Sequence, residues 1–182
     1  MEFDYKNAIK QMGYEPVCKM GKNQCSFAVY RARKNDKSYA IKFPKDFDEW
    51  DRDSLWSEYS VLRKVGNLEG IASAKEFVVS PYLALVKEYI SGKPMRFFIE
   101  DKGLISRQKI YGEENRKFFR ETLKGIHDAG FARLELVPEN IVLSKGRPIF
   151  IDLGSAINAR DICSETFENY KEKDIWAMEE YF

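Results

Sequence analysis

The sequence predicts an α+β fold in which a small antiparallel sheet with one helix precedes a mainly helical half. Short runs rich in β-branched and aromatic residues recur as far as Ile90, separated by polar turns. After Pro94 a longer segment carries apolar residues at helical spacing. The 182 residues, 44% of them apolar and 14% aromatic, are enough to bury a sizeable core. We expect two domains, residues 1–90 and residues 91–182.

The first half contains four runs with the composition of strands: FAVYRAR, SYAIKF, KEFVV and YLALVKEYI. Between the second and third runs we expect an amphipathic helix over residues 53–65, with Asp53 or Ser54 as its N-terminal cap. Its apolar residues recur at spacings of three and four: Leu55, Tyr59, Leu62 and Val65. One helix is therefore expected within the sheet-forming half.

The second half opens with a predicted helix over residues 113–129, which Gly130 ends. The runs IVLS and PIFID, separated by residues 145–147, are typical of a hairpin. Residues 171–182 predict a terminal helix.

Composition excludes several classes of protein. The 30 basic and 29 acidic residues nearly cancel, so no global field favours nucleic acid or an anionic membrane. No apolar run approaches the ~18 residues of a membrane span. The cysteines Cys18, Cys25 and Cys163 form no CxxC pair, which favours a reducing cytoplasm over secretion.

Several motifs occur in a fixed order: residues 39–42 (YAIK), Glu58 on the predicted helix, residues 83–92 (LALVKEYISG), residues 138–143 (PENIVL) and residues 151–154 (IDLG). Taken together, they resemble the motifs of eukaryotic-type protein kinase domains, pared down as in RIO-type and other small archaeal kinases. The resemblance covers roughly residues 17–178. It implies a two-lobed protein kinase-like fold, with a small antiparallel-sheet N-lobe and a truncated, mainly helical C-lobe.

The resemblance implies an ATP site. Lys42 matches the strand lysine that reaches the α- and β-phosphates, and Glu58 matches the helix glutamate that pairs with it. The backbone of Glu88 and Ile90 matches the hinge that contacts the adenine edge. The remaining nucleotide-binding positions implied are Gly21 in the phosphate-covering loop, Val29 and Ala40.

The resemblance also implies the metal-binding and catalytic residues. Asn140 and Asp152 match the two residues that hold Mg²⁺ on the nucleotide phosphates. Glu135 lies five residues before Asn140, where kinases carry the aspartate that accepts the proton of the acceptor hydroxyl. Val137 replaces a lysine that often contacts the transferred phosphate.

Two further residues draw attention. Lys87 falls on the position behind the adenine pocket, where a buried ammonium needs an anionic partner or a lowered pKa. Either it pairs with Glu58 or Asp152, or a slip of one residue leaves it facing solvent. His127, the single histidine, matches a structural histidine before the catalytic loop and is not assigned to chemistry.

Three functions stay open at this point. The first is an ATP-dependent Ser/Thr protein kinase acting on a protein substrate. The departures at Glu135, Val137 and the single-glycine loop also fit a pseudokinase whose nucleotide pocket serves a partner. The lack of an Ala-Pro-Glu motif and of docking helices after residues 174–176 fits a kinase with a small-molecule acceptor.

Overall fold

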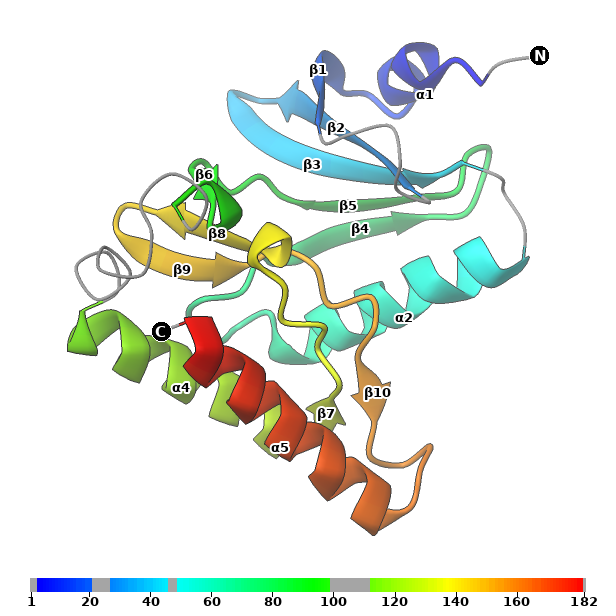
Figure 1. Cartoon of the computed structure of the whole chain (residues 1–182). Helices are drawn as coiled ribbons and strands as arrows, with labels where there is room; N and C mark the ends of the chain where they lie inside the picture. Colours follow the sequence, from blue (N-terminus) through cyan, green and yellow to red (C-terminus); the bar gives the residue numbers. More distant parts are fainter. Residues whose placement is uncertain (1–2, 21–26, 46–48, 99–111, 182) are drawn as a thin grey trace. The chain divides into compact units, whose positions relative to one another are not determined.

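The structure is a computed structural model of the 182-residue chain, and it describes residues 3–20, 27–45, 49–98 and 112–181 (Figure 1). The chain divides into two compact units. The first comprises Met1–Tyr59 and Ser73–Tyr89, and the second comprises Ser60–Ala72 and Ile90–Phe182. Because residues 60–72 belong to the second unit, the division into residues 1–90 and 91–182 stays a prediction.

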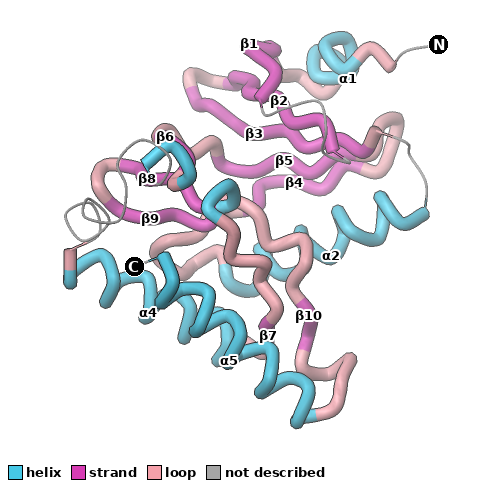
Figure 2. The backbone as a smooth tube through the Cα atoms, in the orientation of Figure 1, coloured by secondary structure: helices cyan, strands magenta, loops and turns pink. Residues whose placement is uncertain are grey.

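A five-stranded antiparallel sheet forms the first unit, in the order β1-β2-β3-β5-β4 (Figure 2). It contains the four predicted runs and one further strand at its edge. The strands are β1 (Glu15–Met20), β2 (Phe27–Lys34), β3 (Lys37–Pro44), β4 (Ala74–Val78) and β5 (Ala84–Glu88). The mixed α+β class predicted from the sequence is therefore correct.

A tight turn fixes the register of β2 against β3. Lys34 pairs with Lys37, and the two residues between them, Asn35 and Asp36, have φ of 50° and 59°. Positive φ at both central positions is the geometry of a type I′ hairpin, which Asn and Asp tolerate well. From this turn onward, alternate residues of β3 point to opposite faces of the sheet.

One face of the sheet packs against α1 (Tyr5–Gln11), a short helix that the sequence analysis missed. Asp4 caps this helix by accepting a hydrogen bond from the Asn7 backbone N–H at 3.0 Å. Ala8 and Ile9 are its buried residues, and both belong to the cluster between helix and sheet. That cluster also contains Ala28, Tyr30, Ala32, Ile41, Phe43, Ala84 and Val86.

The helix α2 (Glu49–Val65) begins four residues before the predicted start. Asp53 and Ser54 therefore lie inside the helix, and the prediction that one of them caps it is wrong. Glu49 and Asp51 in the first turn favour the earlier start, since carboxylates stabilise the N-terminal end of a helix. The ring of Trp50 also stacks on Phe27 of β2, with centroids 6.4 Å apart.

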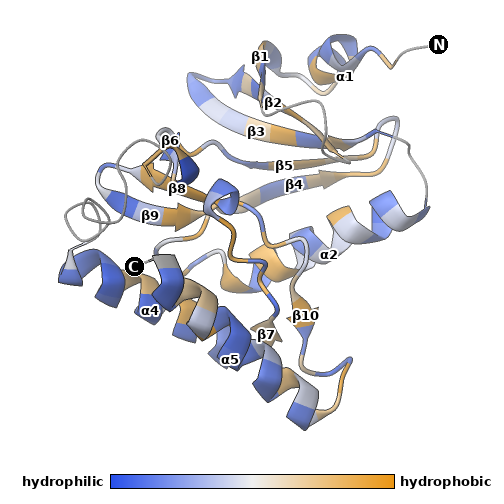
Figure 3. Ribbon diagram, viewed as in Figure 1, coloured by the Kyte–Doolittle hydropathy of each residue, from blue (hydrophilic) through white to orange (hydrophobic). Residues whose placement is uncertain are grey.

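In the second unit, α4 (Glu113–Asp128) matches its predicted range closely, and hydrophobic and hydrophilic residues alternate along it (Figure 3). Gly130 follows with a φ of 85°, which explains why glycine ends this helix. Its buried side chains include Phe119, whose ring stacks on Phe150 at 4.5 Å. Both rings are buried and belong to the core of the second unit.

The predicted hairpin is present as β8 (Ile141–Ser144) and β9 (Arg147–Phe150). It turns through Lys145 and Gly146, whose φ values of 51° and 81° again mark a type I′ turn. The remaining short elements of this unit are β6 (Lys93–Pro94), β7 (Phe131–Ala132), a 3₁₀ turn (Pro138–Asn140) and β10 (Ile157–Asn158).

The terminal helix α5 spans Ser164–Tyr181, so it begins seven residues before the predicted start at Lys171. Phe167 and Met178 are buried on it, together with Asp174. The prediction missed residues 164–170, the first seven of the helix, of which only Phe167 is buried, so no apolar repeat marks them.

Candidate functional site

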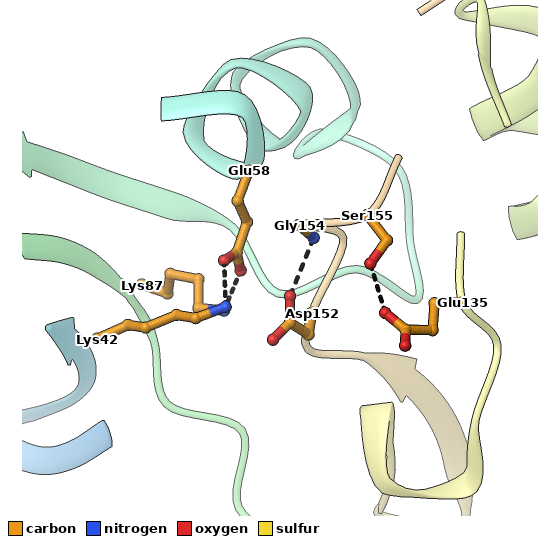
Figure 4. A network of polar contacts seen from close by, with 7 residues as sticks. All are labelled: Lys42, Glu58, Lys87, Glu135, Asp152, Gly154 and Ser155. Carbon is orange, nitrogen blue, oxygen red and sulfur yellow. Dashed lines mark hydrogen bonds and ion pairs between the residues drawn. The ribbon is translucent and has the colours of Figure 1, made fainter. Parts of the chain in front are cut away.

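In the first unit, two lysines converge on one glutamate. Lys42 Nζ lies 2.7 Å from Glu58 Oε2, and Lys87 Nζ contacts the other carboxylate oxygen, Oε1 (Figure 4). The Glu58 side chain is fully buried, and the side chains of Lys42 and Lys87 are only 6% and 7% exposed. We refer to these three residues as the lysine–glutamate triad. The contact with Glu58 excludes the solvent-facing alternative for Lys87.

Strand register explains why both lysines reach the same carboxylate. Lys42 on β3 is paired with Leu85 on β5, and Ala40 is paired with Lys87. Residues two apart on a strand share a face, so Lys42 and Lys87 are diagonal neighbours on the face opposite the α1 cluster. Glu58, on the helix that covers this face, is within reach of both. The ring of Phe27 on β2 adds a cation–π contact, 4.5 Å from Lys42 Nζ.

The other predicted nucleotide-binding residues of the first unit fall on the same sheet. Val29 is paired with Lys42 across β2 and β3, so it shares the face that carries Ala40 and Lys42. The backbone N–H of Glu88 donates to Ser73 O at 2.9 Å, and the contact of this residue with adenine stays a prediction. Gly21 lies outside the described residues, and Ile90 belongs to the second unit.

In the second unit, the two predicted metal ligands lie across the β8–β9 hairpin from each other. Ile151 N–H donates to the carbonyl of Asn140 at 2.9 Å, so Asp152 directly follows the residue bonded to Asn140. Asp152 Oδ1 accepts a hydrogen bond from Gly154 N–H at 2.9 Å, which fixes the carboxylate in its turn (Figure 4). The hairpin therefore brings the backbones of Asn140 and Asp152 close to each other, and their role as metal ligands stays a prediction.

The loop before the 3₁₀ turn places the backbone of Glu135 next to the Asn140 side chain. Asn140 Nδ2 donates to the Glu135 carbonyl at 3.2 Å, which leaves the amide oxygen of Asn140 as the atom for a cation. Glu135 has a φ of 49°, and its carbonyl also accepts from Val137 N–H at 2.7 Å. Two hydrogen bonds thus fix the backbone of a residue in an uncommon left-handed conformation.

A contact that the sequence analysis did not anticipate involves the Glu135 side chain. Ser155 Oγ, in the turn after Gly154, donates a hydrogen bond to Glu135 Oε2 (Figure 4). Ser155 directly follows the motif IDLG, but the spacing of that motif does not indicate where the serine hydroxyl points. The position of Ser155 next to Gly154 is the one feature of the sequence that could have drawn attention to it.

The loop rests on a buried polar pair. His127 Nε2 lies 3.0 Å from Asp174 Oδ2, and Asp174 Oδ1 accepts from the Leu134 backbone N–H at 2.9 Å. His127 and Asp174 are 7% and 5% exposed, respectively. The structural role predicted for His127 is therefore confirmed. Asp174 connects α5 to the residue before Glu135, a role that the sequence analysis missed.

The donor set fits a magnesium ion. Mg²⁺ prefers oxygen ligands and is usually held by one or two protein carboxylates together with phosphate oxygens. Asn140 and Asp152 offer an amide and a carboxylate oxygen from adjacent hairpin positions. The residues that the structure describes contain no cluster of three or more His, Cys, Asp or Glu, the donor set of a cage built by protein alone.

Comparison with known proteins agrees with this geometry. Residues 14–174 match the family model of the protein kinase domain. The Bud32 subunit of the KEOPS complex from Pyrococcus abyssi is 32% identical over 92 residues, which cover 46% of this chain and 40% of that protein. The striated muscle preferentially expressed protein kinase of Danio rerio is 29% identical over 115 residues, 60% of this chain and 4% of that protein.

The family model matches most of the chain, and the protein therefore belongs to the protein kinase domain family. It has distant similarity to the atypical kinase Bud32. The chain spans well under half the length of these two curated relatives. None of the helices in the described ranges is both long and apolar enough to cross a membrane.

Proposed function

We propose that this protein is an ATP-dependent phosphotransferase, a minimal and atypical Ser/Thr protein kinase. The observation that carries the proposal is the buried ion pair between Lys42 and Glu58, at 2.7 Å. Burying two opposite charges contributes little to stability, because the cost of desolvation offsets most of their attraction. A buried ion pair therefore points to a functional role. In the protein kinase family, the matching pair orients the lysine toward the nucleotide phosphates.

The residues of the second unit support the rest of the assignment. Asn140 and Asp152 would hold Mg²⁺, which neutralises the charge on the phosphates when bound. Glu135 is exposed to solvent and is the carboxylate that would accept the proton of the acceptor hydroxyl. The Glu135 side chain is one methylene longer than that of aspartate. The left-handed backbone at Glu135 changes the direction in which this side chain leaves the main chain.

Lys87 would act through Glu58 rather than on substrate. Lys87 donates a hydrogen bond to Glu58 Oε1, and Lys42 donates one to Oε2. If Lys42 turns toward phosphate, Glu58 still has Lys87 as its ion-pair partner. This makes Lys87 a positioning residue in the proposed reaction. We further propose a cytoplasmic protein with a protein substrate or partner.

Transfer of radiolabelled γ-phosphate tests the proposal. Wild type, Glu135→Ala and Asp152→Ala would be compared for labelling of the protein itself, a generic basic protein and a pool of small metabolites. We expect labelled protein with wild type and little or none with either variant. Label in metabolites alone would instead indicate a small-molecule kinase.

A thermal-shift titration with ATP, with and without Mg²⁺, gives the complementary measurement. We expect stabilisation by ATP that increases with Mg²⁺ in wild type and loses its Mg²⁺ dependence in Asp152→Ala. Stabilisation of the protein by ATP without any phosphate transfer would indicate a pseudokinase. No stabilisation by ATP would refute every nucleotide-based function.

A further inference from the structure

We infer that Ser155 is a phosphorylation site that the protein modifies itself, within one molecule, with the γ-phosphate of ATP. This inference rests on the proposed function and adds a specific acceptor to it. The acceptor is a residue of the chain, selected by its contact with the proposed base.

The first argument is the hydrogen bond. Ser155 Oγ–H donates to Glu135 Oε2, so the hydroxyl proton already points at the carboxylate that would take it. A general base has to lie within hydrogen-bond reach of the proton it removes. Ser155 meets this requirement before any other acceptor has bound.

The second argument is that the structure fixes both partners. Ser155 lies in a turn closed by the hydrogen bond from Ala156 N–H to Leu153 O at 3.1 Å. Leu153 is completely buried and Ala156 nearly so, which anchors the turn on both sides of the serine. The Glu135 backbone is held by the hydrogen bonds described above. The backbone is therefore fixed on both sides of the contact.

The third argument is the position of Ser155 relative to the proposed metal ligand. Asp152 precedes Ser155 by three residues, and the hydrogen bond from Gly154 N–H to Asp152 Oδ1 closes the segment between them. Ser155 is half-buried and its hydrogen bond to Glu135 is at the surface, so the residue stays accessible to a phosphate donor. Acceptor, base and metal ligand thus come from one small part of the second unit.

The reaction balances without any further reactant. Ser155 Oγ attacks the γ-phosphorus of ATP and forms a new P–O bond. The bond from that phosphorus to the β–γ bridging oxygen breaks, and ADP leaves with the electron pair. The hydroxyl proton passes to Glu135 Oε2 and from there to water. The products are ADP and phosphoserine at position 155.

Peptide mapping by mass spectrometry after incubation with MgATP tests the inference directly. We expect phosphate on Ser155 in wild type, with a rate constant that does not change when the protein is diluted, because transfer occurs within one molecule. Ser155→Thr should retain the modification, and Glu135→Gln should lose it. Ser144→Ala, which removes another half-buried serine of the same unit, is the matched control and should behave as wild type.

Failure of the inference can be separated from failure of the proposed function. Phosphate on an added basic protein or on other residues, with none on Ser155, would overturn the inference and leave the kinase proposal intact. Bound nucleotide without transfer to any acceptor would overturn both. A Ser155 rate that rises in proportion to protein concentration would overturn modification within one molecule.

A second readout needs no nucleotide. Hydrogen exchange of backbone amides would be compared between wild type, Ser155→Ala and Ser144→Ala. Loss of the hydrogen bond to Glu135 should speed exchange over residues 134–137 by about 2- to 10-fold, the factor that corresponds to one ordinary hydrogen bond. Exchange that is equal in all three proteins would show that Ser155 does not hold Glu135 in solution, and the inference would fall.

Discussion

The lysine–glutamate triad makes a sharp prediction about stability. Glu58→Gln keeps the shape of the side chain but removes the carboxylate that Lys42 and Lys87 both contact. At an effective dielectric constant of about 20, Coulomb's law gives about 6 kcal/mol for one pair of charges at the 2.7 Å observed for Lys42.

We therefore expect Glu58→Gln to lower the free energy of unfolding by about 3–5 kcal/mol, the usual cost of breaking a buried ion pair. Lys87→Met is the matched control, because Glu58 keeps its contact with Lys42 and methionine fills a similar volume. We expect that variant to change the free energy of unfolding by no more than about 1 kcal/mol.

Urea denaturation of the three proteins at pH 7, followed by circular dichroism, measures both values. An equal loss in Glu58→Gln and Lys87→Met would refute this reasoning, because it would show that Lys42 alone does not satisfy the carboxylate. Wild-type stability in Glu58→Gln would show that the triad does not form.

Three further predictions concern other parts of the chain. Asp174→Ala removes the partner of His127 and should lower the free energy of unfolding by about 2–4 kcal/mol in urea denaturation. A loss no larger than that of the exposed-site control Glu180→Ala would contradict this prediction. Burial, aided by a nearby carboxylate, raises the pKa of Tyr14 from 10.0 to about 12, so the stability that this residue contributes should be intact below pH 10 and lost as pH rises toward 12. Unfolding measured over this range in wild type and Tyr14→Phe should show the steeper loss in wild type, and parallel curves would refute the assignment. Gly92→Ala would place a Cβ 2.1 Å from the carbonyl oxygen of Leu143 and should cost about 1–3 kcal/mol, whereas Gly112→Ala, with open space around its Cβ and no positive φ, is the control for added volume.

Strands and the hairpin could be predicted from the sequence, because each is specified locally. The four runs of β-branched and aromatic residues and the Lys145-Gly146 turn carry their own signals. The helix α1 carries a weak signal, since only Ala8 and Ile9 of its seven residues are buried. The start of α5 was missed because Phe167 is the only buried residue among its first seven, so no apolar repeat marks that stretch.

Within the candidate site, too, the sequence predicts local relations but not contacts between distant segments. Asn140 and Asp152 could be located by their spacing, because a short hairpin fixes the distance between them. The partner of Lys87 could only be narrowed to Glu58 or Asp152, because that choice depends on how β3, β5 and α2 come together. The contact between Ser155 and Glu135 joins two loops 20 residues apart, and no pattern in the sequence specifies it.

The most direct test of the central claim is the rate of phosphoryl transfer by Glu135→Gln, measured together with its affinity for MgATP. The account predicts a rate about 10²- to 10⁴-fold below wild type, the usual contribution of a general base, with unchanged affinity. A variant that transfers phosphate at the wild-type rate would contradict the assignment of Glu135 as the base.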